Sequence, residues 1–206
     1  MNLARKYLPL LLWAILVQGF FFADASFADP TGKKRKVLII SAEQGGIFAS
    51  GGLGHATHGL AKALNEEGHQ ADVLMPFYTE INEAAAERVK PANLHFDVDL
   101  DYDTKGKPRA AAEFTVHSHA HDKVQTWLFR HETPDVTKNF FYNPKAASAL
   151  SYGPYGPGDK LVKAFGAMAK AAARFAQERG YEHVIFNDWP GGIGVPFFLD
   201  LAENGG

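Results

Sequence analysis

The segment between Val37 and Pro76 constrains the fold more than any other part of the chain, because its order is strand, glycine-rich loop, helix, strand. The continuous apolar run Val37–Ile40 is typical of a strand buried on both faces of a parallel sheet. A glycine-rich loop follows at 45–54. Apolar residues then recur at helical spacing before Gly68, which is expected to end the helix, and these are Leu53, Ala56, Leu60, Ala63 and Leu64. With a second strand at 70–75, the segment predicts one βαβ unit with a right-handed crossover.

The middle of the chain predicts a different arrangement. Three segments, 94–100, 110–117 and 123–130, alternate or cluster apolar residues, which predicts an antiparallel hairpin or meander inserted into the α/β body. A stretch rich in Pro, Gly, Tyr and Asn at 131–158 predicts a long irregular loop. The expected fold class is therefore α/β, a Rossmann-like three-layer sandwich with a mostly parallel sheet.

A second long helix is expected near the end of the chain. Asp159 can cap its start and Gly180 follows its end, while one stripe carries the apolar residues Leu161, Phe165, Met168, Ala172 and Phe175. The run Val184–Phe186 predicts another buried strand. It leads into Asn187, Asp188 and Trp189, at the carboxyl edge where open α/β sheets build their sites.

The composition favours a globular protein and weighs against some partners. Hydrophobic residues make up 46% of the chain and aromatic residues 13%, enough for a substantial core. Basic and acidic residues nearly balance, at 21 and 23, so nucleic acid is not expected as a partner. The basic run at 33–36 is interpreted as the solvated entry to the first strand rather than a localisation patch. Because the chain has no cysteine, disulfides and thiolate metal sites are excluded.

The N-terminal residues predict export. Residues 1–28 are interpreted as a signal peptide, followed by a short linker at 29–35 and one domain at 36–206. Basic residues precede an uncharged apolar stretch at 8–22, and small residues suited to cleavage follow at 23–28. An uncleaved anchor at 8–22 is the alternative, although the stretch is shorter than the roughly 20 residues that span a bilayer. We expect a periplasmic or secreted mature form that is not embedded in a membrane.

The loop Glu43–Gly54 is the strongest candidate for binding. Its glycines allow a ligand to approach the backbone, and the helix that follows offers free N–H groups and a partial positive charge to a phosphate. The loop is neither a Walker loop nor a dinucleotide fingerprint, so a tight turn that packs its helix on the sheet is an equal alternative.

Several segments occur together in a recognisable order, namely Ser41-Ala42-Glu43, Gly51–Gly54, Gly59–Leu64, Gly68-His69 and Leu74–Tyr78. In spacing and residue type they resemble the opening of glycogen and starch synthases. Three later segments keep the order of that family, and these are Trp127–Phe129, Tyr155–Lys163 and Asn187-Asp188-Trp189. The resemblance extends from about Lys36 to Asn204.

The resemblance implies a function and a set of site residues. It implies the N-terminal half of a two-domain GT-B fold that transfers glucose from ADP-glucose to the non-reducing end of an α-1,4-glucan, without cofactor or metal. Substrate-binding roles are implied for Ser50, Gly51, Gly52, Leu53, Asp159, Asp188 and Trp189, and a place beside the transferred sugar for Asn187. Preorganised N–H donors and cations suit such a reaction, since negative charge develops on the departing diphosphate.

Two positions depart from the family pattern. Where the family's glycine loop carries a lysine, this chain has Ala49, and Asn187 occupies the place of a histidine. An asparagine can donate a hydrogen bond, but it carries no charge and transfers no proton near neutral pH. The resemblance also implies that a separate C-terminal GT-B half is needed for transfer. An exported module that binds a glucan or nucleotide sugar without turnover is therefore the alternative function.

Other candidates are weaker. His117, His119 and His121 alternate, which on a strand places three imidazoles on one face, but a solvated hairpin turn is favoured over a zinc or copper site. His55 and His58 lie one helical turn apart and are interpreted as rim residues of the glycine loop. The aromatic residues Trp127, Phe140, Phe141 and Tyr142 suit core packing better than stacking on sugar rings.

Overall fold

The computed structural model describes residues 32–78, 81, 83–102, 108–131 and 158–204. The chain divides into two units, 1–33 and 34–206, and all elements described below belong to the second. The predicted signal peptide lies outside the described residues, as does most of the predicted loop at 131–158, so both stay predictions. No helix among the described residues is long and apolar enough to span a membrane.

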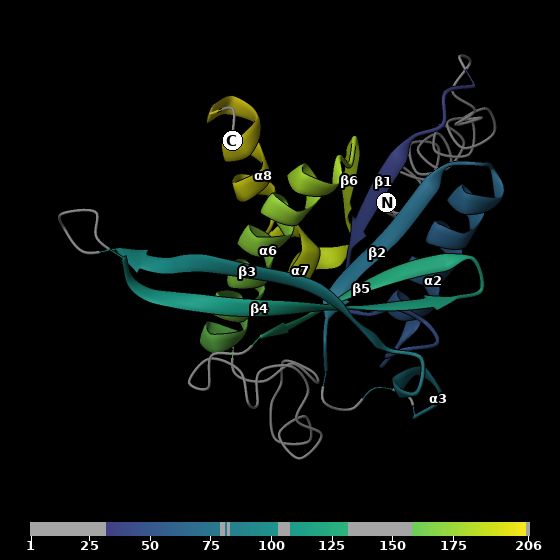
Figure 1. Ribbon diagram of the computed structural model, residues 1–206, viewed down its shortest axis with the longest axis horizontal. Coiled ribbons are helices and arrows are strands. Elements are labelled where there is room, and N and C mark those ends of the chain that lie inside the picture. Colours follow the sequence, from purple (N-terminus) through teal and green to yellow (C-terminus); the bar gives the residue numbers. More distant parts are fainter. Residues whose placement is uncertain (1–31, 79–80, 82, 103–107, 132–157, 205–206) are drawn as a thin grey trace, which may run out of the picture. The chain divides into compact units, whose positions relative to one another are not determined.

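The elements of the second unit follow one another in an α/β order (Figure 1). They are β1 (Lys36–Ile40), α2 (Gly52–Glu66), β2 (Gln70–Pro76), α3 (Glu83–Ala86), β3 (Lys90–Tyr102), β4 (Pro108–His121), β5 (Val124–His131), α6 (Gly158–Arg179), β6 (His183–Phe186), α7 (Asp188–Gly192) and α8 (Val195–Asn204). The predicted βαβ unit is β1, α2 and β2. Gly68, at φ 90°, ends the first helix as expected.

Six strands form one sheet in the order β3-β4-β5-β2-β1-β6. The pairs of β1 with β2, β1 with β6 and β2 with β5 are parallel, whereas β3, β4 and β5 form an antiparallel meander. This confirms the predicted fold class. The meander is less separate than predicted, because β5 lies beside β2 and so continues the same sheet (Figure 1).

The face of the sheet covered by α6 carries the larger apolar core. Its fully buried residues include Leu38, Ile40, Leu74, Phe129, Phe165, Met168, Ala172 and Phe175. Phe175 sits among the rings of Phe96, Phe129, Trp127 and Tyr181. The stripe predicted for this helix is thus confirmed over the residues whose side chains are described. The helix begins at Gly158, so Asp159 lies in its first turn and not at the predicted capping position.

The same face contains one buried carboxylate, that of Asp72 on β2, which is 4% exposed. Its Oδ2 accepts hydrogen bonds from the Tyr181 hydroxyl at 2.6 Å, the Trp127 indole at 3.3 Å and the Gln70 amide at 3.4 Å. Burial, and then the charge of Asp72, raises the pKa of the Tyr181 hydroxyl. Trp127 therefore belongs to the core, as interpreted from the sequence, while residues 140–142 lie outside the described ranges.

The opposite face packs against α2 through smaller side chains. Its buried residues are Val37, Ile39, Ala61, Ala71, Val73 and Val124. The apolar stripe predicted for α2 is partly wrong, because the buried positions of the helix are Gly54, Thr57 and Ala61, while Leu60 is 39% exposed. Thr57 faces inward because of long-range hydrogen bonds, which are described below. An apolar sequence pattern cannot reveal such bonds.

The strand β6 lies at the edge of the sheet and, among the described residues, pairs only with β1. Its residues Val184, Ile185 and Phe186 are half-buried, so the prediction of a fully buried strand is wrong at this position. The basic run at 33–36 leads into β1, with Lys36 as the first residue of the strand, in agreement with the sequence interpretation.

Candidate functional site

The carboxyl ends of β1, β2 and β6 meet at one edge of the sheet. Ile40 at the end of β1 pairs with Leu74 on one side and with Phe186 on the other. The glycine-rich loop leaves β1 at this edge, and Asn187 follows β6, donating its backbone N–H to the carbonyl of Ile40 at 2.9 Å. The two predicted site segments are therefore brought together where open α/β sheets bind ligands.

Asn187 and the N-terminal part of α2 are joined by hydrogen bonds. The Asn187 amide donates to the Thr57 hydroxyl at 2.7 Å, and the Ser41 hydroxyl lies 3.0 Å from the same oxygen. The Thr57 hydroxyl also donates to the carbonyl of Leu53 at 2.9 Å. Asn187 thus holds the start of α2 against the sheet, a positional role that an uncharged amide performs well.

The N-terminus of α2 is open to solvent. Gly51 is the N-cap residue in extended backbone, no side chain caps the helix, and both Gly51 and Gly52 are exposed. A Cβ atom added at either glycine would meet nothing within 4 Å. The first N–H groups of a helix carry partial positive charge, so this end of α2 can bind an anion.

A buried carboxylate, that of Glu43, holds the loop in its shape. Glu43 is 2% exposed and accepts hydrogen bonds from both the backbone N–H, at 3.0 Å, and the hydroxyl of Ser50. Its own N–H donates to the Ser41 hydroxyl at 3.3 Å. The predicted binding residue Ser50 is therefore committed to Glu43 through its side chain, and its contribution to the site is to fix the loop.

Two further glycines allow close packing inside the loop. A Cβ on Gly54 would lie 2.5 Å from the Cβ of Ala49, and Gly45 donates its N–H to the carbonyl of Gly54 at 2.8 Å. Ala49 itself is exposed. The structure divides the glycines of the predicted loop into an exposed pair, Gly51 and Gly52, and a packed pair, Gly45 and Gly54.

The turn after β2 anchors the other side of the loop. Tyr78 is fully buried, and its hydroxyl donates to the carbonyl of Ala42 at 2.6 Å, while its ring lies 4.3 Å from that of Phe48. The loop is therefore tied to β2, to α2 and, through Thr57, to Asn187.

Two further predicted site residues, Asp188 and Trp189, follow the end of β6 at this edge. Asp188 follows Asn187 directly, is exposed, and adopts φ 63°, a left-handed conformation that is uncommon outside glycine. Trp189 continues the short helix α7. Gly191 is required there, since a Cβ on it would lie 2.7 Å from the carbonyl oxygen of Ile40. Asp159 belongs to a separate element, the first turn of α6.

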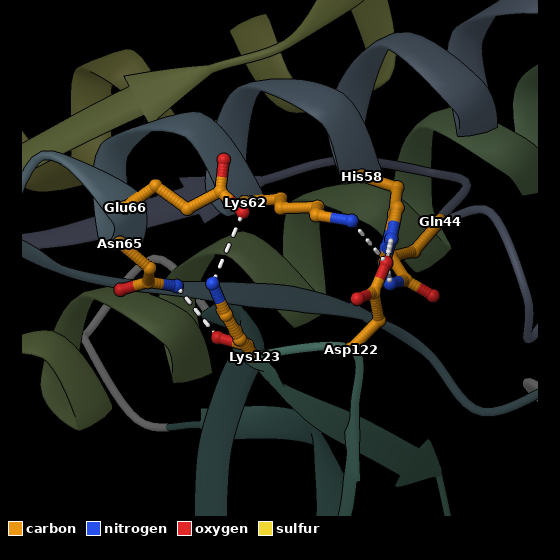
Figure 2. Close-up of polar contacts among 7 residues, drawn as sticks. All are labelled: Gln44, His58, Lys62, Asn65, Glu66, Asp122 and Lys123. Atoms are coloured by element: carbon orange, nitrogen blue, oxygen red, sulfur yellow. Dashed lines mark hydrogen bonds and ion pairs between the residues drawn. The ribbon is translucent and has the colours of Figure 1, made fainter.

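Sequence reasoning missed a polar network that joins the loop, α2 and the β4–β5 turn (Figure 2). The side chain of Gln44 lies 2.8 Å from Nδ1 of His58, and Nε2 of His58 lies 3.2 Å from the carboxylate of Asp122. Lys62 donates to the same carboxylate at 2.8 Å. These hydrogen bonds, first from Lys62 and then from His58, lower the pKa of Asp122, and Asp122 in turn raises the pKa of Lys62. His58 was expected near the loop, but its partner Asp122 is 64 residues away in sequence.

The three alternating histidines are not in a solvated turn, so that interpretation is wrong. β4 extends to His121, and the turn consists of Asp122 and Lys123, both with positive φ. His119 is 1% exposed, burial lowers its pKa, and neither ring nitrogen has a hydrogen-bond partner among the described residues. No group of three or more His, Asp or Glu side chains in the described part of the chain is placed to hold a metal ion.

A shallow hollow of about 340 Å³ lies over the meander, lined in part by His95, His117 and Arg130. It is formed by β3, β4 and β5 and is separate from the residues at the end of β6. The glycine loop therefore remains the site that the geometry supports best.

Comparison with known proteins identifies the family. Residues 36–204 match the model of the starch synthase catalytic domain. The chain belongs to the starch synthase catalytic domain family. No curated protein matches it at the level of sequence. The family match covers nearly the same range as the resemblance found in the sequence and includes the glycine loop, Asn187 and Asp188.

A solved structure of this family has a similar fold. The catalytic domain of starch synthase IV from Arabidopsis thaliana, bound to ADP and acarbose, matches with a TM-score of 0.64 and 21% identity. The match covers 84% of this chain and 32% of that one. At this identity the likeness shows the fold, which is consistent with one Rossmann-like half of a GT-B starch synthase.

Proposed function

We propose that this chain forms the N-terminal half of a glucosyl-transfer site of the starch synthase type, in which ADP-glucose is the donor and an α-1,4-glucan the acceptor. The observation that carries the proposal is the uncapped, exposed start of α2 at Gly51 and Gly52, beside Asn187 at the carboxyl edge of the sheet. Free N–H groups at that point suit the diphosphate of a nucleotide sugar. Family membership and the ADP in the related starch synthase IV support the same ligand class.

In this proposal each loop residue has a physical task. Gly52 and Leu53 present backbone N–H groups to the diphosphate, Ser50 and Glu43 keep the loop in shape, and Asn187 holds the helix start in place. Such preorganised donors stabilise the charge that develops on the departing diphosphate. Ala49 supplies no cation to this charge, so we infer that the remaining cations come from a second GT-B half.

The chain alone is expected to transfer no glucose. It spans 32% of the length of the related starch synthase IV chain. Incorporation of labelled glucose from ADP-glucose into glycogen, above a boiled control, measures this directly. Transfer by the purified chain would show that it needs no second half. Restoring lysine at Ala49 and histidine at Asn187 is not expected to create activity, since positioning between two domains would still be missing.

The binding site itself is tested by Gly51→Asp. Its Cβ has open space, and the extended backbone of Gly51 suits any residue, so aspartate can cap α2 and raise stability by a few tenths of a kcal/mol. The same carboxylate repels a diphosphate, so we expect about tenfold weaker binding of ADP by calorimetry. Gly51→Ser is the matched control, because serine caps the helix without charge and is expected to weaken binding less.

Either of two results would refute the proposal. One is the absence of any heat on adding ADP or ADP-glucose to the wild-type chain. The other is equal affinity for ADP in the wild type, Gly51→Asp and Gly51→Ser, because the helix start would then not contact the ligand.

A second candidate function is an exported module that binds a glucan without turnover. The observations that favour it are the neutral side chains of Ala49 and Asn187, which carry no charge for phosphate or sugar transfer, together with the apolar stretch at 8–22. Heat with maltoheptaose and none with ADP-glucose would support this alternative. Export is tested by fractionation of cells that express the full chain, where a cleaved product starting near residue 29 is expected outside the cytoplasm.

A further inference from the structure

The network in Figure 2 links the glycine loop to a hairpin turn far from it in sequence. Asp122 is the first residue of the β4–β5 turn, and it contacts α2 through His58 and Lys62. His58 in turn contacts Gln44, which is 1% exposed and belongs to the loop. The loop, the helix that follows it and a turn 64 residues from His58 therefore meet at one imidazole ring.

Gln44 controls the shape of the loop through its backbone. Its N–H donates to the carbonyl of Phe48 at 3.0 Å, and its carbonyl accepts from the N–H of Phe48 at 3.0 Å. The next residue, Gly45, donates to the carbonyl of Gly54 inside the first turn of α2. A Cβ on Gly45 would lie 3.3 Å from the Cβ of His58, so His58 also packs directly against the loop. A change in the orientation of His58 is thereby transmitted to Gln44 and Gly45.

The two contacts of His58 distinguish the tautomers of its neutral ring. An ionised carboxylate can only accept a hydrogen bond, so Nε2 of His58 carries the hydrogen that faces Asp122. In the neutral ring Nδ1 is then the acceptor, and the side-chain amide of Gln44 donates to it. Asp122 therefore selects the tautomer that Gln44 can bind, in the way that a partner on one ring nitrogen sets the role of the other.

We infer that Asp122 and His58 are positioning residues for the ligand-binding loop, with Asp122 acting through the tautomer of His58 on Gln44. Exposed ion pairs contribute little to global stability. The effect is instead local, because Gln44 and Gly45 lie at the base of the loop that ends at Gly51. The role in ligand binding rests on the proposed function, whereas the role in ordering the loop does not.

The decisive variant is Asp122→Gly. Glycine adopts the positive φ of this turn without strain, so the hairpin is preserved while the carboxylate is lost. We expect amide hydrogen exchange of Gly45 and Ser50 to become about three- to fivefold faster, and ADP binding to weaken by the same factor. Asp122→Asn retains an acceptor for Nε2–H and a residue that tolerates this backbone, so it is expected to restore most of the wild-type behaviour.

The matched control is Glu66→Gln. Glu66 pairs with Lys123 at 3.2 Å, which joins the same helix to the same turn but makes no contact with Gln44 (Figure 2). Glu66→Gln is expected to leave both the exchange of the loop and ADP affinity unchanged. Ring ¹⁵N spectra report the tautomer of His58. It is expected as the Nε2–H tautomer in the wild type and as a mixture of tautomers in Asp122→Gly. If Asp122 only attached the helix to the turn, the tautomer would not change.

The outcomes separate the two levels of the inference. Unchanged exchange in Asp122→Gly, or an equal effect of Glu66→Gln, would refute the positioning role. Faster exchange with an altered His58 tautomer, in a chain that binds no ADP even as wild type, would uphold the positioning role while refuting the proposed function.

Discussion

The two faces of the sheet differ in how their polar groups are satisfied. On the α6 face the one buried carboxylate, Asp72, accepts hydrogen bonds from three donors and is surrounded by aromatic rings. On the α2 face the side chains are smaller, and both ring nitrogens of the buried His119 have no hydrogen-bond partner among the described residues. No side chain of the described residues caps the start of α2. The α6 face thus satisfies its buried carboxylate within an aromatic core, whereas the α2 face leaves a buried imidazole unpaired and ends in the exposed helix start that we propose as the binding site.

The largest expected effect tests the stability of the α6 face. Phe175→Ala removes a fully buried ring at the centre of the aromatic cluster and is expected to lower the free energy of unfolding by about 3–5 kcal/mol. Urea denaturation followed by circular dichroism measures the change. At low temperature, where the variant is still folded, its affinity for ADP should equal that of the wild type. A clear loss of affinity in the folded variant would contradict the division between the two faces.

A smaller effect is expected from Tyr181→Phe, which removes one donor to the Asp72 carboxylate. Hydrogen bonds to charged groups contribute about 1.5–3 kcal/mol, so a loss of about 2 kcal/mol is expected. The raised pKa of Tyr181 also gives a pH signature: above about pH 10 the unfolded chain loses the phenolic proton while the folded chain retains it, so stability falls as pH rises. Tyr181→Phe should lose this alkaline component, and an identical alkaline profile would show that Tyr181 is not its source.

His119 provides the corresponding test on the α2 face. Because burial lowers its pKa, the folded chain keeps the ring neutral while the unfolded chain takes up a proton below about pH 6.5, so stability falls as pH drops through that range. His119→Leu removes both unpartnered nitrogens. Its free energy of unfolding, relative to that of the wild type, is expected to be about 1 kcal/mol higher at pH 5 than at pH 8. Thermal unfolding at the two pH values measures the difference. Equal pH dependence in both proteins would contradict a buried neutral histidine.

The smallest effect concerns the outer surface of α2. Leu60 is 39% exposed although it lies on the stripe that the sequence predicts to be buried. Leu60→Gln is expected to change the free energy of unfolding by less than about 0.5 kcal/mol, as is usual for surface positions. Ala61→Gln, one residue further and fully buried, is the control and should destabilise strongly. A large loss of stability in Leu60→Gln would show that Leu60 is part of the core.

Much of the fold could be predicted because it depends on local patterns. The continuous apolar strand at 37–40, the helix stop at Gly68 and the stripe from Phe165 to Phe175 are each visible within a short window. The glycine loop and Asn187 were also placed at one edge, since parallel strands direct their carboxyl ends to the same side.

The parts that could not be predicted depend on contacts distant in sequence. Thr57 faces inward because Ser41 and Asn187 satisfy its hydroxyl, and no apolar periodicity records such a bond. The network of His58 with Asp122 joins residues 64 apart. The burial of His119 follows from the length of β4, which the polar alternation of its last residues concealed. In each case the position of a polar side chain is set by parts of the chain that a local pattern does not include.

The tight contact between Ala49 and Gly54 couples the residues that these two positions can carry. Any side chain at 54 would collide with the Cβ of Ala49, so position 54 has to be glycine as long as position 49 carries a Cβ. A lysine at position 49 meets no such obstacle, because Ala49 is exposed and the Cβ of a lysine occupies the same place. A cationic side chain at position 49 is therefore sterically compatible with this loop as long as position 54 stays glycine.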